Sequence, residues 1–257
     1  MGDIQTLVMF SGGKDSFLTV CRYLIQREPV GLLAFDNGSL AGTKCIEDGA
    51  HRLITRYGVK EVKWEGIYNT ASLQRELSVW SQTATCMEVA PILGAVNYAQ
   101  LQCLHCQTAM WVAAIAYATA KGYRRISSGY RVTDYTCMGS SLYLKQLQRV
   151  AQRVGVAVDF PLWHDVQVGE ELAFDVEEEL SQHGLMQTVC GPQCMIRQYT
   201  SLDIRAIEKD LDLYFESLLL PIVNTQLPRL REQFRHTQLF RGEVDTPKVC
   251  RVERGLY

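Results

Sequence analysis

Ser11-Gly12-Gly13-Lys14-Asp15-Ser16 is the stretch that decides the fold class of this 257-residue chain. It separates an apolar run, residues 4–10, from an amphipathic run, residues 17–27, so the pattern predicts strand, loop and helix in succession. The glycines permit a tight turn with exposed backbone N–H groups, the helix N-terminus adds partial positive charge, and Lys14 adds a full one. Ser11 and Ser16 can donate hydroxyl hydrogen bonds, and Asp15 can cap the helix or help to hold Mg²⁺. Together these residues predict a cradle for polyphosphate.

Strands and helices continue to alternate after this loop. Residues 30–35 and 61–64 are expected strands, and residues 44–57 form an expected helix closed by Gly58. This order predicts an α/β fold with a doubly wound parallel sheet, flanking helices and right-handed crossovers. Ligands of such sheets bind at the carboxyl ends of the strands.

The second half of the chain continues the pattern less regularly. Residues 66–100 lack a clear period, and we expect an insertion or a partner-facing segment there. Further strands are expected over 125–128 and 156–162, and helices over 108–121, 142–154 and 170–182, with a last long helix from Ser201 to just before Pro221. Trp111 and Tyr214 lie on expected helices and are assigned to the core. The domain prediction is one unit over 1–200, followed by a helical C-terminal extension over 201–257.

Composition narrows the class of protein. The chain has 26 Lys and Arg against 28 Asp and Glu, so its net charge of −2 gives no global attraction for nucleic acid, and only the tail over 229–254 is basic. No apolar run reaches the roughly 20 residues of a membrane span. The start of the sequence does not have the pattern of a signal peptide, and nine cysteines in a reducing compartment indicate metal binding, catalysis or burial. We therefore expect a cytoplasmic protein with no membrane contact.

The loop over 11–16 does not have the Gly-x-x-x-x-Gly-Lys-Ser/Thr spacing of kinases and motor ATPases. It resembles the pyrophosphate loop of the N-type ATP pyrophosphatases, the PP-loop superfamily that includes GMP synthetase and NAD synthetase. The resemblance implies the adenine nucleotide alpha hydrolase-like fold, with ATP and Mg²⁺ as cofactors. It implies that Ser11 to Ser16 hold the pyrophosphate of ATP while a substrate oxygen attacks the α-phosphorus. It also places Phe35-Asp36-Asn37-Gly38, with Phe35 and Asp36 foremost, beside the adenine and ribose. The alternative is a Ser/Gly turn that only begins a helix.

Two pairs of cysteines form the second candidate site. Cys103 and Cys106 enclose Leu104 and His105 in a Cys-x-x-Cys, and Cys190 and Cys194 lie in a Gly/Pro turn. Four thiolates can bind Zn²⁺ tetrahedrally or hold a [4Fe-4S] cluster, and buried inert thiols are the third reading. His105 is a fifth candidate ligand, but we expect it to be an exposed spacer residue.

The cysteine pattern and the later motifs resemble two different branches of the superfamily. Cys103 and Cys106 are similar in place to a Cys-x-x-Cys of the tRNA 2-thiocytidine synthetases, which use it for an iron-sulfur cluster, but here Ser128-Gly129-Tyr130-Arg131 replaces the usual continuation of that family. The run from Gly129 to Tyr135, followed by Asp159-Phe160-Pro161-Leu162, resembles the corresponding part of 7-cyano-7-deazaguanine synthase. The segment from Cys190 to Arg197 resembles a shortened form of the zinc-binding run of that family. That family does not normally have the pair at 103 and 106.

The combined expectation is an enzyme that adenylates a carbonyl or carboxylate, releases pyrophosphate and then transfers nitrogen to the substrate. A small molecule of the 7-deazaguanine type, a nucleobase, is the first choice, and iron-sulfur-dependent tRNA thiolation is the alternative. A catalytically inactive nucleotide-binding scaffold is the second alternative. Arg131 and Asp134, on the loop after the strand at 125–128, are candidates to hold a substrate anion and to bind Mg²⁺ or a base edge. The relatives often form homodimers, and analogy extends that expectation to this chain.

Overall fold

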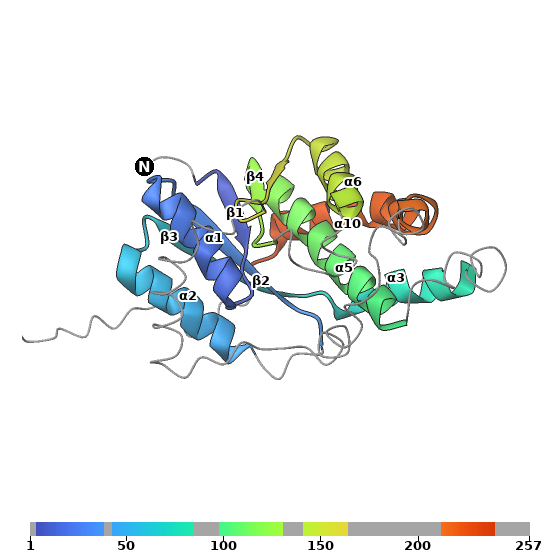
Figure 1. The fold of residues 1–257 in the computed structure, drawn as a ribbon, viewed down its shortest axis with the longest axis horizontal. Helices are drawn as coiled ribbons and strands as arrows, with labels where there is room; N and C mark the ends of the chain where they lie inside the picture. Colours follow the sequence, from blue (N-terminus) through green and yellow to red (C-terminus); the bar gives the residue numbers. More distant parts are fainter. Residues whose placement is uncertain (1–3, 39–42, 85–97, 131–140, 164–211, 240–257) are drawn as a thin grey trace, which may run out of the picture.

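The computed structural model describes residues 4–38, 43–84, 98–130, 141–163 and 212–239. Its centre is a five-stranded, all-parallel sheet in the order β3-β2-β1-β4-β5 (Figure 1). The strands are β1 (Thr6–Met9), β2 (Val30–Asp36), β3 (Val62–Asn69), β4 (Arg125–Ser127) and β5 (Ala157–Asp159). The chain builds outward from β1 to β3 on one side and continues at β4 on the other, so the strand order reverses between β1 and β4. The doubly wound sheet predicted from the sequence is confirmed.

Helices cover both faces of the sheet. The helices α1 (Lys14–Ile25) and α2 (Lys44–Tyr57) lie on one face, while α3 (Ala71–Ala84), α5 (Tyr98–Lys121), α6 (Ser141–Gln152) and α10 (Leu220–His236) gather on the other (Figure 1). Successive side chains of β1, and of Phe10 directly after it, pack alternately into the two hydrophobic cores. Leu7 and Met9 join the cluster around α5, and Val8 and Phe10 join the cluster around α1 and α2. A strand buried on both faces explains the continuous apolar run at 7–10.

The helix α5 begins ten residues before the predicted start at residue 108. Its 24 residues make a helix about 36 Å long, whereas β4 has only three residues. The C-terminal end of α5 lies at the amino edge of the sheet, where Arg124 N donates to Gln5 O. The N-terminal half therefore passes the carboxyl edge, and Asn37, just after β2, contacts Cys106 there.

Part of the segment over 66–100 is regular structure. The predicted strand over 61–64 continues as β3 to Asn69, and α3 follows directly. Thr70 joins the two elements to the end of β2, because its backbone N–H donates to Asp36 O at 2.7 Å. Leu73 and Leu77 of α3 are buried in the cluster around α5. Residues 85–97 lie outside the described residues, so the insertion stays a prediction.

The predicted end of the last helix before Pro221 is wrong. A π-helical turn, η4 (Phe215–Leu219), leads directly into α10, and Pro221 lies in the first turn of α10. Proline lacks an N–H and its ring crowds the carbonyl four residues earlier, so it normally ends a helix. Here Leu220 N–H bonds to Phe215 O, five residues back, and this wider turn directly precedes the proline. The helix then packs along α5, with Tyr117 and Phe234 edge to face at 5.2 Å.

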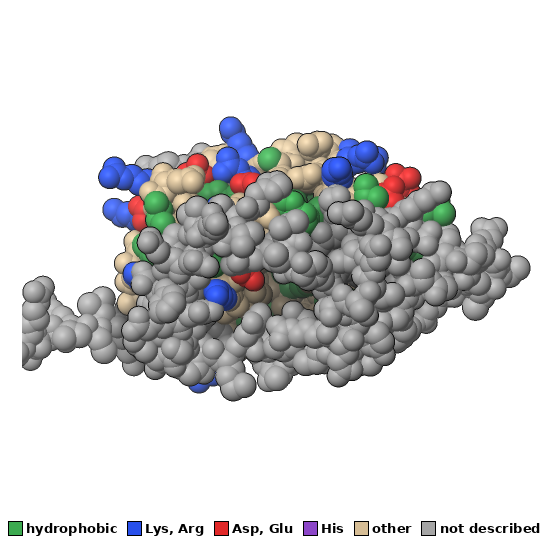
Figure 2. Space-filling view, viewed as in Figure 1, with side chains coloured by type: hydrophobic (Ala, Val, Ile, Leu, Met, Phe, Trp, Pro, Cys, Tyr) green, Lys and Arg blue, Asp and Glu red, His purple; other side chains and the backbone are tan. Residues whose placement is uncertain are grey.

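Charge on the described surface is mixed. Figure 2 shows Lys and Arg side chains in separate groups along the rim of the viewed face, with acidic side chains between them. Within the described ranges, no helix has both the length and the apolar character that crossing a membrane requires.

Candidate functional site

The Ser11–Ser16 loop follows β1 at the carboxyl edge of the sheet. Gly12 has φ +73°, a conformation that side chains disfavour, and Gly13 is the N-cap of α1 in an extended conformation. Ser11 Oγ accepts from Gly13 N at 3.3 Å and donates to Ser16 Oγ at 3.3 Å, while Ser16 Oγ donates to Gly13 O at 2.7 Å. The two serines thus shape the loop in this structure. Lys14 and Asp15, both half-buried, begin the helix whose positive end faces the loop.

The segment after β4 packs directly against this loop. A Cβ atom added to Gly129 would lie 2.7 Å from both the backbone carbon and the backbone oxygen of Asp15. Only glycine therefore fits between the strand end and the N-terminus of α1 at this distance. The contact places Gly129, and with it the start of the segment after β4, beside the candidate phosphate cradle.

The end of β2 lies at the same carboxyl edge. Phe35 is buried, and the half-exposed Asp36 accepts from Gly38 N at 2.8 Å through Oδ1 and from Asn69 Nδ2 at 3.2 Å through Oδ2. These bonds hold Asp36 in a compact turn at the end of β2 and join it to the end of the neighbouring strand β3. Asn37 Nδ2 donates to Cys106 Sγ at 3.0 Å. This edge is therefore linked to the N-terminal half of α5.

Cys103 and Cys106 are buried thiols one turn apart on α5. Positions three residues apart lie on the same side of a helix, so the two sulfurs suit a single metal ion. Cys190 and Cys194 lie outside the described residues, and within the described part no group of three or more metal-binding side chains occurs. The four-cysteine site stays a prediction.

His105 is not the exposed spacer that the sequence suggested. It is 2% exposed, and its ring nitrogens lie 2.7 Å from Tyr214 Oη and 3.1 Å from Ser78 Oγ. Burial lowers the pKa of His105 to about 4. The reason for the difference is tertiary: Tyr214, more than a hundred residues later, covers this side of α5. His105 therefore joins α5 to α3 and to the C-terminal helical region.

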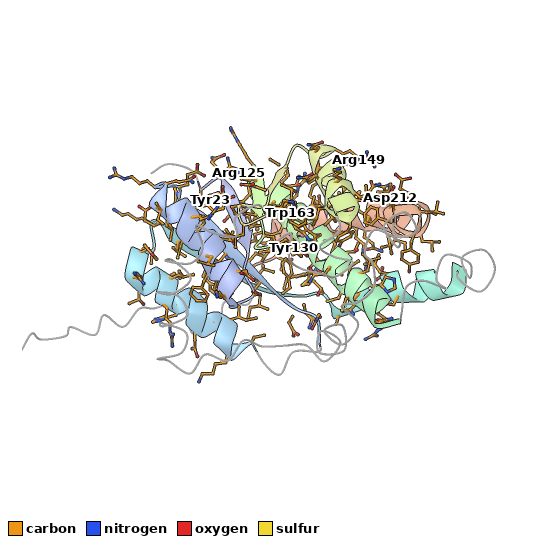
Figure 3. All side chains as sticks on the ribbon, in the orientation of Figure 1. Tyr23, Arg125, Tyr130, Arg149, Trp163 and Asp212 are labelled. Carbon is orange, nitrogen blue, oxygen red and sulfur yellow. The ribbon has the colours of Figure 1, made fainter. Side chains whose placement is uncertain are left out.

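An aromatic cluster lies at the carboxyl ends of β4 and β5. Tyr130 stacks on Trp111 with ring centroids 6.2 Å apart, and Phe160 meets both rings edge-on at 5.8 Å. Trp163 continues the cluster at 6.5 Å from Phe160. In Figure 3, Tyr130 and Trp163 lie near the centre of the molecule, between α1 and α5. Sequence reasoning missed this grouping, although Tyr130 and Phe160 belong to the two motifs quoted above.

Polar contacts from α1 hold the chain around β5 in place. Tyr23 Oη donates to Asp159 Oδ2 at 2.7 Å, and Arg22 Nη1 donates to Pro161 O at 2.6 Å. Burial of the Tyr23 hydroxyl, together with the nearby Asp159 carboxylate, raises the pKa of Tyr23. Arg125 lies over the Tyr23 ring at 5.8 Å, and Figure 3 shows these two side chains together above α1. The residues on either side of Phe160 are therefore fixed to α1.

Not every predicted site residue can be placed. Lys14, Asp15, Ser16, Phe35 and Asp36 lie at one edge of the sheet, as the topology requires. Arg131 and Asp134 lie outside the described residues, although Tyr130, the residue before Arg131, is adjacent to the loop through Gly129.

Comparison with known proteins shows which solved structures share this fold. No family model and no curated protein matches the chain. A solved 4-thiouridine synthetase in complex with RNA and bound ATP matches 91% of this chain and 54% of its own, with a TM-score of 0.54 and 14% identity. The chain shares the fold of that synthetase. It spans about half of the synthetase's length, and the adenine nucleotide alpha hydrolase-like fold expected from the sequence is confirmed.

Two further solved structures are similar over much of the chain. A predicted subunit of tRNA methyltransferase from Methanocaldococcus jannaschii has a TM-score of 0.43 and 17% identity, covering 66% of this chain and 73% of that one. NMN synthetase from Francisella tularensis has a TM-score of 0.44 and 14% identity, covering 92% of this chain and 89% of its own.

Proposed function

We propose that this chain is an ATP-dependent enzyme of the N-type ATP pyrophosphatase kind, which adenylates a carbonyl or carboxylate oxygen and releases pyrophosphate. The observation that carries the proposal is the place of the Ser11–Ser16 loop. It lies at the carboxyl end of β1, beside the point where the strand order reverses, and Gly129 of the neighbouring strand end packs against it. Ligands of open parallel sheets bind at this point.

The loop suits the pyrophosphate of ATP chemically. Gly13 caps α1 without a side-chain acceptor, so an anion can take the part that a capping side chain otherwise plays. Lys14 adds positive charge at the same end, and Asp15 is the residue that would help to hold Mg²⁺. ATP bound in this way supplies the leaving group, and Mg²⁺ neutralises phosphate charge.

The reaction then needs positioning and charge stabilisation from the protein. A substrate oxygen forms a bond to the α-phosphorus while the bond from that phosphorus to the bridging oxygen breaks, and the electron pair leaves with pyrophosphate. Lys14 and the N-terminus of α1 stabilise the negative charge on the departing group. A nitrogen nucleophile then attacks the activated carbon, loses its proton to solvent and displaces AMP.

A 7-deazaguanine-type base remains the first choice of substrate, with Arg131 and Asp134 as candidates to contact it. The motifs at 129–135 and 159–162 support this choice. tRNA thiolation is the second candidate, because the Cys106 thiol lies at the edge where Asn37 follows β2, close to the expected nucleotide. The 4-thiouridine synthetase with the same fold was solved with RNA and ATP. The inactive-scaffold alternative predicts ATP binding without turnover.

Replacement of Lys14 tests the proposal. The variant Lys14→Ala should keep its circular dichroism spectrum and lose ATP-dependent pyrophosphate release. The test reaction contains a carboxylated 7-deazaguanine with ammonium in one arm, and tRNA with a sulfur donor in the other. Lys44→Ala is the matched control, because Lys44 is an exposed lysine that also begins a helix, α2. Pyrophosphate release by Lys14→Ala at the wild-type rate would contradict the proposal.

A further inference from the structure

We propose that Tyr130, Phe160 and Trp163 form a stacking platform for the planar heteroaromatic ring of the acceptor, with Gln107 as the polar group that orients it. This inference rests on the proposed adenylating function, and it assigns the acceptor to side chains at the ends of β4 and β5. The ring can belong to a free base or to a base carried in RNA.

The platform is a connected set of rings with a buried back and a partly exposed front. Trp111, behind it on α5, is fully buried, whereas Tyr130, Phe160 and Trp163 are each partly exposed. Trp111 Nε1 donates to Tyr130 Oη at 3.3 Å, which ties the tyrosine to α5. A purely structural aromatic core has no need to keep three of its rings accessible at the ligand-binding edge of a parallel sheet.

Gln107 supplies the polar contact. Tyr130 Oη donates to Gln107 Oε1 at 2.5 Å, so the carbonyl end of this amide is used by the tyrosine. The amide nitrogen is then the end of Gln107 that can donate to a ligand, and a ring carbonyl is the acceptor that suits it. Stacking holds a ring parallel to the platform, and one hydrogen bond to the amide fixes the orientation of the ring within its own plane.

The place of the platform distinguishes the acceptor from ATP. The adenine is expected beside Phe35 and Asp36, at the end of β2. The platform lies at the ends of β4 and β5, on the other side of β1 in the strand order. The phosphate loop follows β1, between these two regions, and Gly129 joins it to Tyr130 in the sequence. An acceptor on the platform thus approaches the phosphates from the side opposite the adenosine.

The surroundings keep the platform rigid. Arg22 and Tyr23 of α1 hold Pro161 and Asp159, the two neighbours of Phe160. Leu162, next to Trp163, is buried in the cluster around α1 and α2. Rings held in this way lose little conformational entropy when a ligand binds, which favours stacking.

The experiment measures ring binding by the whole protein in the presence of Mg²⁺ and α,β-methylene-ATP. The probes are 7-deazaguanine, a short single-stranded RNA, and cyclohexanecarboxylate as a non-planar control, each titrated by calorimetry. Trp163→Ala removes the outermost ring, Trp163→Phe restores an aromatic face, and Trp64→Phe changes a buried tryptophan in the cluster around α1 and α2.

Loss of one stacked aromatic should weaken binding of 7-deazaguanine or the RNA about 5- to 150-fold in Trp163→Ala. Trp163→Phe should recover most of that loss, and Trp64→Phe should match the wild type. Tyr130→Phe keeps the ring but frees Gln107, and should weaken binding about 2- to 12-fold. Tighter binding of one probe identifies the source of the ring. The nucleotide analogue should bind all variants equally.

Equal affinity of Trp163→Ala and wild type for both ring probes would overturn the platform. So would the absence of saturable binding of either ring probe to the wild type, or equally tight binding of cyclohexanecarboxylate. These results are separate from the proposed function, which fails if Lys14→Ala still releases pyrophosphate. A platform that binds rings in a protein that does not adenylate would leave the platform standing and remove the proposed chemistry.

Discussion

Replacement of Gly129 by alanine should damage nucleotide binding more than it damages the fold. The new Cβ would lie 2.7 Å from the backbone carbon and oxygen of Asp15, whereas ordinary contacts begin at 3.4 Å. Both neighbours are backbone atoms, so the strand end and the N-terminus of α1 must move apart. We expect a loss of about 1–3 kcal/mol in the free energy of unfolding, as for other overpacked sites. The displaced loop should also lose at least one hydrogen bond to a phosphate, which is about 10- to 150-fold in ATP affinity.

Gly31→Ala is the matched control for this prediction. A Cβ at Gly31 would overlap the Tyr123 side chain, in the core around Glu65 and away from the phosphate loop. Urea denaturation gives the stability of each variant, and calorimetry with Mg²⁺ and α,β-methylene-ATP gives the affinity. Gly129→Ala should bind the nucleotide much more weakly than Gly31→Ala when the comparison is made at equal fraction folded. Wild-type affinity in a folded Gly129→Ala protein would refute the contact between this segment and the phosphate site.

Three further predictions concern the metal, a buried histidine and a buried carboxylate. Cys103→Ser should lower the zinc or iron bound per chain in elemental analysis, as should Cys194→Ser, and full retention in both would exclude a shared site. Burial lowers the pKa of His105 to about 4. As the pH falls, the unfolded chain therefore takes up a proton on this histidine before the folded chain does. The free energy of unfolding should fall by up to about 1.4 kcal/mol per pH unit between about pH 6.5 and pH 4. His105→Gln should flatten this part of the pH dependence in urea denaturation, and an unchanged slope would argue against the buried neutral ring. Tyr123→Phe should cost about 1–3 kcal/mol in the same assay, because the buried Glu65 carboxylate loses a donor, with nucleotide affinity unchanged.

The Glu65 carboxylate shows how a buried charge is kept in this fold. Burial alone would raise its pKa, but hydrogen bonds from Lys63, Tyr117 and Tyr123 outweigh burial and lower the pKa. The carboxylate thus stays ionised on a buried strand. Gly31 makes room for the Tyr123 hydroxyl, which explains a glycine near the start of the second strand.

Local signals account for what the sequence predicted well. The loop at 11–16, the helix at 44–57 with Gly58 after it, and the alternation of strands and helices each depend on neighbouring residues. The helix α3 does carry a local start signal, because Asn69 and Thr70 precede it and Asn69 Oδ1 accepts from Ala71 N at 3.0 Å. The sequence prediction did not use this signal, and it began α5 ten residues late.

Tertiary contacts decided the remaining features. The burial of His105 depends on Tyr214, and the passage of the last helix through Pro221 depends on the π turn before it. The contact between Gly129 and Asp15 joins residues more than a hundred positions apart, so only the folded chain shows why a glycine is needed there. The aromatic cluster likewise brings together α5 and the ends of two strands.

A crystal structure with Mg²⁺ and α,β-methylene-ATP tests the proposed nucleotide site most directly. We predict that the β- and γ-phosphates lie on the Ser11–Ser16 loop, the adenine lies beside Phe35 and Asp36, and the α-phosphorus faces Tyr130. A γ-phosphate turned towards Tyr130, as phosphoryl transfer would need, or a nucleotide bound away from the loop would contradict it.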